Sequence, residues 1–211
     1  MKITESNIKL YLNTPPRTGS HFLLFNMITD LNIDQKLVLK THTTKYFVDN
    51  KTITITRDPK ECIVSLCSML RTTRNYPIDF PLNSILESDI SNTSYKSASI
   101  VEQIKYYKDF YIKSQQSINT ILPFTFEQVT ENKDLCNETI SKYFNIQYRD
   151  LPKKYVYEGR KNVLLTSKDT GNYKAISDNI SEFDQNFDSL YKEYYKLISL
   201  VKIRQNEIGM I

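Results

Sequence analysis

The sequence predicts an α/β fold in which a parallel sheet of about five strands is flanked by helices. Short alternating or apolar runs that suit strands are separated by longer segments with apolar residues at helical spacing. The 211 residues have the length of one domain, and no internal repeat or low-complexity linker divides them. We therefore expect residues 1–211 to form a single domain whose ligand binds beyond the carboxyl ends of the strands.

The first strand and the first helix are indicated by their apolar patterns. Residues 8–13 alternate in polarity and end at two prolines, which predicts a strand. Residues 20–31 place Leu24, Ile28 and Leu31 at helical spacing among aromatic residues. We expect a buried helix there, directly after the turn that follows the first strand.

Two further short strands and a helix are expected next. Residues 37–39 are apolar and residues 52–56 alternate, so both predict strands. Asp58 followed by Pro59 predicts the start of a helix, because aspartate caps helices and proline suits the first helical position. The apolar face of this helix consists of Ile63, Val64, Cys67 and Leu70.

The second half of the chain is mainly helical. Residues 98–118 predict a long amphipathic helix, and residues 133–144 a shorter one. Between them, residues 120–126 predict a strand that is broken by Pro123. Residues 186–201 carry a stripe of apolar and aromatic side chains and predict the closing helix.

In two segments the apolar residues show no clear helical or strand-like spacing. Residues 71–95 contain Pro77 and Pro81, and we expect a long loop or partly helical insertion there. Residues 159–174 are polar and irregular. The first segment is a candidate for a role in binding, because loops this long in compact domains are often functional.

Composition narrows the class of protein. The net charge of +4, from 28 basic and 24 acidic residues, suits a protein that handles a small polyanion and gives no reason to expect nucleic acid. No apolar stretch reaches roughly 18 residues, so no membrane span is expected. Cys62, Cys67 and Cys136 lack metal-ligand spacing, and we expect three inert thiols in a reducing, cytoplasmic compartment.

The turn between the first strand and the first helix has the composition of an anion-binding loop. Residues 16–20 read Pro-Arg-Thr-Gly-Ser and hold one of only four glycines. Backbone N–H groups and the helix N-terminus can bind an anion there, and Arg17 adds a forked cation. A plain strand-to-helix turn is the alternative. The loop has no Gly-Lys-Ser, so a magnesium–triphosphate site is poorly supported.

Residues that could take part in binding or catalysis also lie at or after the ends of the second and third predicted strands. His42 can act as a base of near-neutral pKa, and Lys40 can stabilise negative charge on a transferring group. Arg57 ends the third strand, and Ser65 lies about two turns into the next helix, so one anion can touch both. The alternatives are a structural histidine, a solvated lysine, a surface ion pair and a helix-face hydroxyl.

Taken in order, these three segments resemble the sulfotransferases that use 3′-phosphoadenosine 5′-phosphosulfate (PAPS). That family has Pro-Lys/Arg-Ser/Thr-Gly-Ser/Thr after its first strand, then Lys-Thr/Ser-His, then Arg-Asn/Asp-Pro with a later serine. The resemblance covers residues 8–174, closely up to Ser65 and loosely beyond. It implies a P-loop NTPase-like sulfotransferase fold, PAPS as co-substrate and no metal.

The resemblance also implies roles for individual residues. His42 would be the general base, with Lys40 and Arg17 neutralising charge on the transferring group. The residues implied to bind PAPS are Arg17, Thr18, Gly19, Ser20, His21, Arg57 and Ser65. Phe126 would stack near the adenine, with a core aromatic as the alternative.

Two more segments enter through the resemblance. Either Ser167 and Lys168 or Arg160 and Lys161 would cover the nucleotide within residues 159–174, and a solvated charge run is the alternative. The insertion at residues 71–95 falls where the family recognises its acceptor.

The implied reaction is transfer of a sulfuryl group from PAPS to a hydroxyl or amine of a small-molecule or glycan acceptor, by in-line displacement. Two alternatives stay open: a P-loop-type small-molecule kinase, and a non-catalytic nucleotide-binding protein on the same scaffold. The sequence leaves the acceptor and the oligomeric state undetermined.

Overall fold

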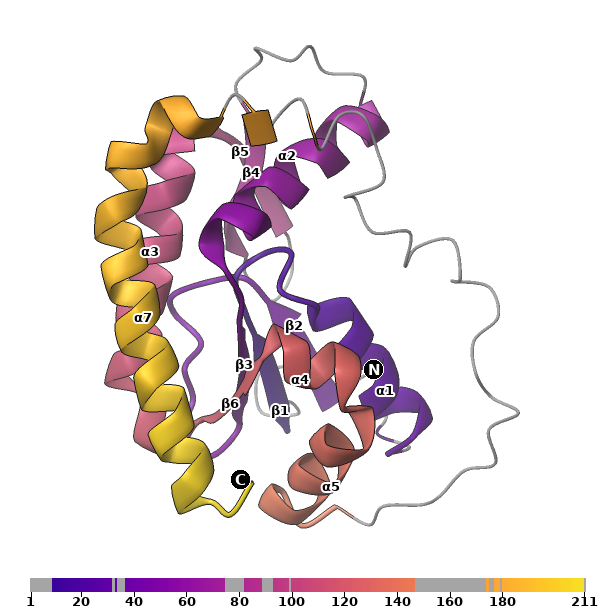
Figure 1. Ribbon diagram of the computed structural model, residues 1–211. Coiled ribbons are helices and arrows are strands. Elements are labelled where there is room, and N and C mark those ends of the chain that lie inside the picture. Colours follow the sequence, from indigo (N-terminus) through magenta and orange to yellow (C-terminus); the bar gives the residue numbers. More distant parts are fainter. Residues whose placement is uncertain are drawn as a thin grey trace.

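A computed structural model describes most of the chain (Figure 1). The described residues are 9–31, 33, 37–74, 82–88, 93–98, 100–146, 174, 177–178 and 180–210. Two predicted features lie outside them: the covering segment at residues 159–174, apart from Lys174, and the alternative pairs of covering residues within it.

The centre of the fold is a parallel sheet. Its strands are β1 (Leu10–Asn13), β2 (Val38–Thr41), β3 (Thr52–Thr56) and β6 (Leu122–Thr125), in the order β2-β1-β3-β6. The predicted α/β class and parallel sheet are confirmed. The predicted number of about five strands in this sheet is wrong: among the described residues the parallel sheet has four.

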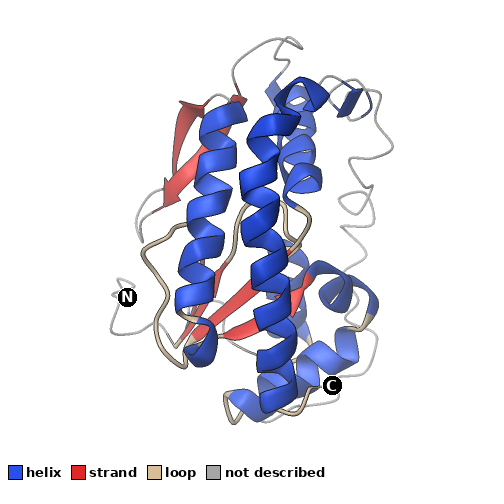
Figure 2. Ribbon diagram, turned by 60° about the vertical axis from the view of Figure 1, so that its left-hand side comes forward, coloured by secondary structure: helices blue, strands red, loops and turns tan. Residues whose placement is uncertain are grey.

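Helices cover both faces of this sheet and its upper end. The helices are α1 (Ser20–Thr29), α2 (Pro59–Arg74), α3 (Ile100–Gln116), α4 (Phe126–Glu131), α5 (Lys133–Tyr143) and α7 (Asp184–Glu207), with 3₁₀ turns η3 (Ile118–Thr120) and η7 (Ile180–Phe183). Helices α1, α4 and α5 lie on one side of the sheet, and α3 and α7 run side by side on the other (Figures 1 and 2). Helix α2 lies beyond the carboxyl ends of the strands.

The two faces of the sheet differ in chemistry, because alternate residues of a strand point to opposite sides. The face toward α1, α4 and α5 is apolar and consists of Leu10, Leu12, Ile53, Ile55, Leu122 and Phe124. The opposite face of β3 carries Thr52, Thr54 and Thr56, all buried. A second apolar cluster joins α2, α3 and α7 and includes Tyr107, Tyr111 and Phe187. The sheet therefore anchors one core, and the helices beside and above it build another.

Strand β6 runs through Pro123 without the predicted break. Pro123 pairs with Thr54 of β3, and its carbonyl oxygen accepts a hydrogen bond of 2.9 Å from Nε2 of Gln205. The nitrogen and carbonyl of one strand residue point to the same side, so the proline nitrogen faces the open edge. A missing N–H there removes no ladder hydrogen bond.

Part of the expected insertion is a hairpin rather than a loop or helix. Strands β4 (Leu82–Ser88) and β5 (Thr93–Ala98) pair antiparallel next to α2 and α3, and α2 itself extends to Arg74. The register shifts between Ser84 and Glu87. Because this irregularity interrupts the alternation of side chains, the sequence lacks the period of two that reveals a strand.

Helix α7 is longer than predicted, and its extra turns are held by polar contacts. Gln205 is buried and donates to the Pro123 carbonyl and to Oε1 of Gln128. Because a polar residue is buried here, the helical spacing of apolar residues does not continue to the end of α7, and the sequence predicted the helix to end too early. Among the helices described, none is both long and apolar enough to cross a membrane.

The start of α2 offers a test of the fold. Asp58 caps the helix as predicted: Oδ1 accepts from the N–H of Glu61 at 2.9 Å, and both carboxylate oxygens accept from the hydroxyl of Tyr191 in α7. We expect Asp58→Ala to lower the free energy of unfolding by about 1–3 kcal/mol, because a cap and an interhelical bond are lost. Urea denaturation measures this. The exposed Asp188→Ala is the control, and an equal effect in both variants would contradict the assignment.

Candidate functional site

The strand order reverses between β1 and β3, and the region beyond the carboxyl ends of these two strands is called the crevice below. The chain passes from β1 to its neighbour β2 and then crosses to β3 on the other side of β1. Connections that leave in opposite directions open a gap above the sheet, and ligands of such sheets bind there. The loop after β1 holds Arg17 and Gly19, and the end of β3 holds Arg57, so two of the predicted cationic side chains meet at this crevice.

The loop after β1 is shaped by two residues with positive φ. Arg17 has a φ of 64° and Gly19 a φ of 85°, the left-handed region that favours glycine. A Cβ on residue 19 would also lie 3.2 Å from the Phe126 ring, so the conformation favours glycine and the tight space beside the ring adds to this preference. The hydroxyl of Thr18 donates to the Pro15 carbonyl at 2.9 Å and closes the turn.

Helix α1 begins at Ser20, immediately after this turn. Gly19 stands at the N-cap and supplies no side-chain hydrogen bond to the first amides of the helix. The positive end of a ten-residue helix therefore faces the crevice beside Arg17. A bound anion is the partner that such amides favour.

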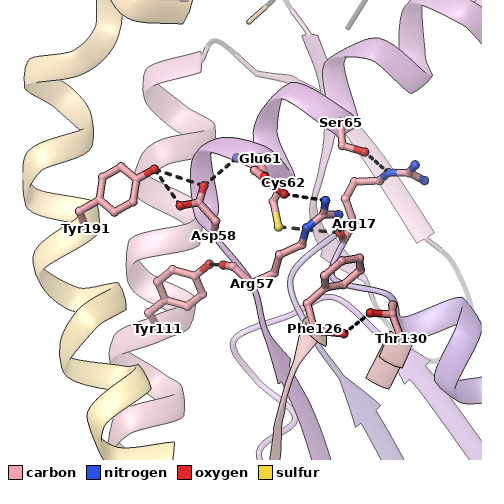
Figure 3. Close-up of polar contacts among 10 residues, drawn as sticks. All are labelled: Arg17, Arg57, Asp58, Glu61, Cys62, Ser65, Tyr111, Phe126, Thr130 and Tyr191. Carbon is pink, nitrogen blue, oxygen red and sulfur yellow. Dashed lines mark hydrogen bonds and ion pairs between the residues drawn. The ribbon is translucent and has the colours of Figure 1, made fainter. Parts of the chain in front are cut away.

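Arg57 connects the end of β3 to the loop after β1 (Figure 3). Its NH1 donates to the Arg17 carbonyl at 2.9 Å, and its NH2 forms an ion pair of 2.8 Å with Oε2 of Glu61. The guanidinium lies 3.9 Å from the centre of the Phe126 ring. Arg57 is only 11% exposed, so these contacts act with little screening by water.

The Arg17 side chain turns toward α2. Its Nε donates to the hydroxyl of Ser65 at 3.0 Å. The prediction that Arg57 and Ser65 bind one anion together stays a prediction. In the structure, Ser65 accepts from the Arg17 side chain, while Arg57 donates to the Arg17 backbone. Burial lowers the pKa of Arg17, and the nearby Arg57 charge lowers it further. Two cations held this close favour an anion between or beside them.

Lys40, His42 and His21 form a second group beside the first. Nζ of Lys40 lies 3.2 Å from Nε2 of His42 and 3.1 Å from Nε2 of His21. Nδ1 of His42 lies 2.6 Å from the Thr14 carbonyl, which can only accept, so Nδ1 carries the proton. Nε2 of His42 is therefore an acceptor, and in this state it accepts from Lys40.

Burial changes the protonation of this group. It lowers the pKa of His42 to about 3, with the Lys40 charge as the next cause, so the imidazole is neutral at pH 7. It also lowers the pKa of Lys40 to about 8, and the Arg17 charge adds to this. Lys40 thus couples the two groups, since it contacts His42 and is close enough to Arg17 for their charges to interact.

Three tyrosines of α3 donate hydrogen bonds to backbone carbonyls of the site. Tyr106 donates to the carbonyl of His42 at 2.7 Å, Tyr107 to that of Pro16 at 2.7 Å, and Tyr111 to that of Arg57 at 2.8 Å. Each hydroxyl supports a different strand end. The sequence predicted only a long amphipathic helix here; the spacing of four residues between Tyr107 and Tyr111 is the signal that places both on one face.

The structure thus gathers most of the predicted residues into two adjoining clusters. The first holds Arg17, Thr18, Gly19, Ser20, Arg57, Ser65 and Phe126, and the second holds His21, Lys40 and His42. Phe126 presents one ring face to Arg57. Ser167 and Lys168, like Arg160 and Lys161, lie outside the described residues. The sequence missed Glu61, although its place four residues after Arg57 on a helix start is the spacing of an ion pair.

The protonation of His42 can be measured directly, because the chain has only two histidines. In His21→Gln, we expect the remaining imidazole to show no titration between pH 5 and 8 and to give ¹⁵N shifts of the Nδ1–H tautomer. The unfolded chain binds this proton near pH 6.5, so the free energy of unfolding falls as the pH drops below that value. His42→Gln assigns the other signal by NMR. A His42 midpoint near 6.5 would contradict the burial and the Lys40 contact.

Comparisons with known proteins were made against family models, curated proteins and solved structures. No family model, curated protein or solved structure matches this chain. Its function is therefore inferred from the chemistry of the residues at the crevice.

Proposed function

We propose that the chain is a sulfotransferase that moves a sulfuryl group from PAPS to an acceptor hydroxyl or amine. The observation that carries this proposal is the hydrogen bond from Arg57 to the Arg17 carbonyl. It joins the anion-binding loop after β1 to the cation at the end of β3, beside a neutral imidazole and a lysine. Resemblance of the three sequence segments to the PAPS-dependent family supports the same reaction.

In the proposal, the two ends of the nucleotide bind to the two sides of the crevice. The 5′-phosphosulfate binds to the loop at residues 16–20 and the amides of α1, and the 3′-phosphate binds to Arg57 and Ser65. Glu61 occupies NH2 of Arg57 at 2.8 Å and is 39% exposed. A phosphate that approaches Arg57 therefore competes with a partly exposed carboxylate.

The proposed transfer is an in-line displacement. The acceptor oxygen or nitrogen forms a bond to sulfur, and the bond between sulfur and the bridging phosphate oxygen breaks. The electron pair of that bond stays on the phosphate, which leaves as adenosine 3′,5′-bisphosphate. Nε2 of His42 takes the acceptor proton, and Arg17 and Lys40 neutralise charge that develops on the sulfuryl and bridging oxygens.

Lys40 has two states in this proposal. Without a ligand, it donates to Nε2 of His42 and keeps the imidazole from accepting another proton. The negative charge of the nucleotide draws the ammonium toward the sulfuryl oxygens and frees Nε2. The same charge raises the pKa of both groups, which makes His42 a stronger base when PAPS is bound.

Calorimetry with adenosine 3′,5′-bisphosphate tests the binding site. We expect binding of this bisphosphate without magnesium, and no comparable binding of ATP. Arg57→Gln should weaken it roughly 10- to 100-fold, because one charge-assisted bond is worth about 1.5–3 kcal/mol.

The matched variant Glu61→Gln removes the competing carboxylate. It should strengthen bisphosphate binding by up to about fivefold, because the ion pair that the phosphate displaces has a partly exposed carboxylate and is worth about 1 kcal/mol. Equal weakening in both variants would mean that the pair serves the fold alone. Magnesium-dependent ATP turnover would favour a kinase instead.

Turnover tests the role of His42. We expect His42→Ala to reduce the rate of sulfuryl transfer by about 10²-fold or more, since a general base is lost, while bisphosphate affinity changes little. Exposed His21→Ala is the control, because it removes the other imidazole that contacts Lys40. A matching loss of bisphosphate affinity in His42→Ala would refute the role.

A further inference from the structure

Gln103, in the first turn of α3, is a buried amide without a hydrogen-bond partner. The side chain is 0% exposed, and neither Nε2 nor Oε1 has a partner among the described residues. A buried amide usually satisfies both atoms, because leaving them unpaired opposes folding. Both atoms can therefore bind a partner that the described part of the chain does not supply.

The position of Gln103 relates it to the crevice. Tyr106 and Tyr107 follow it by three and four residues, so all three lie on one face of α3. Those tyrosines donate to the carbonyls of His42 and Pro16, at the ends of β2 and β1. Helical side chains lean toward the helix N-terminus, so Gln103 extends this row beyond the strand ends.

The first turn of α3 also adjoins the hairpin that follows α2. Hairpin β4–β5 packs beside α2 and α3, and α3 begins directly after β5 (Figures 1 and 2). The nucleotide in the proposal occupies the loop after β1 and the end of β3. Gln103 lies one turn of α3 before Tyr106, the residue that donates to the carbonyl of His42.

We propose that Gln103 binds the acceptor and selects one with adjacent hydroxyls, as in a sugar; this inference rests on the proposed function. A carboxamide offers a donor and an acceptor side by side. Two neighbouring hydroxyls present the matching pair, with a third oxygen left for transfer near His42. A phenol or an aliphatic amine satisfies at most one of the two groups and leaves the other buried and unpaired, which a site of this kind rejects strongly.

The test compares wild type with Gln103→Met, which keeps the length of the side chain and removes the amide. The probes are cellobiose and p-nitrophenol as acceptors, with PAPS as donor. We expect wild type to sulfate cellobiose, and Gln103→Met to lose at least tenfold in kcat/KM for cellobiose with less than a twofold change for p-nitrophenol. The bisphosphate affinity should be unchanged. The urea midpoint should stay or rise, because an unpaired amide is removed.

The other outcomes would contradict either the role of Gln103 or the proposed function. Transfer to p-nitrophenol but not to cellobiose, or equal losses for both acceptors, would overturn the role of Gln103 and leave the sulfotransferase intact. A fall in the urea midpoint of Gln103→Met would show that the amide also supports the fold. In that case Gln103→Asn, which keeps a shorter amide, must restore the midpoint without restoring the selectivity for cellobiose; otherwise the role of Gln103 is overturned. Absence of bisphosphate binding in wild type would instead overturn the proposed function itself.

Discussion

The hydrogen bond from Arg57 to the carbonyl of Arg17 is the interaction on which the site depends. It ties the end of β3 to the turn after β1 across the point where the strand order reverses. The turn needs this support because Arg17 takes a positive φ, which is unfavourable for a residue with a side chain. Tyr107 and Tyr111 hold the two neighbouring carbonyls from α3, so a single helix fixes both walls of the crevice.

Charge is concentrated at this crevice at a cost in solvation. Arg17, Lys40 and Arg57 gather there, and burial lowers the pKa of both Arg17 and Lys40. Glu61 and the Phe126 ring compensate Arg57, while two imidazole nitrogens accept from Lys40. A polyanion would replace these weaker partners with stronger ones. The cations of this site therefore have internal partners that an anion could replace.

Local signals in the sequence sufficed for much of the fold and of the site. The alternating threonines and isoleucines of β3 and the Asp58–Pro59 helix start appear where they were predicted. The positions of Arg17, His42 and Arg57 followed from one rule, that the carboxyl ends of parallel strands share an edge. That rule needs only the strand boundaries and their direction.

The parts of the fold and of the site that the sequence did not predict depend on long-range contacts, which produce no periodic pattern of apolar residues. The β4–β5 hairpin is irregular in register, and Pro123 is tolerated only because β6 is an edge strand. Pairing of Ser65 with Arg17 rather than Arg57 reflects how α2 packs over the loop. The depressed pKa of His42 follows from its burial and from Lys40, which spacing along the chain does not reveal.

A crystal structure of the chain with adenosine 3′,5′-bisphosphate would test the central idea most directly. The account requires the 5′-phosphate on the amides that open α1, the 3′-phosphate on the guanidinium of Arg57, and the carboxylate of Glu61 turned away from it. A nucleotide found elsewhere, with the Arg57–Glu61 ion pair intact, would contradict it.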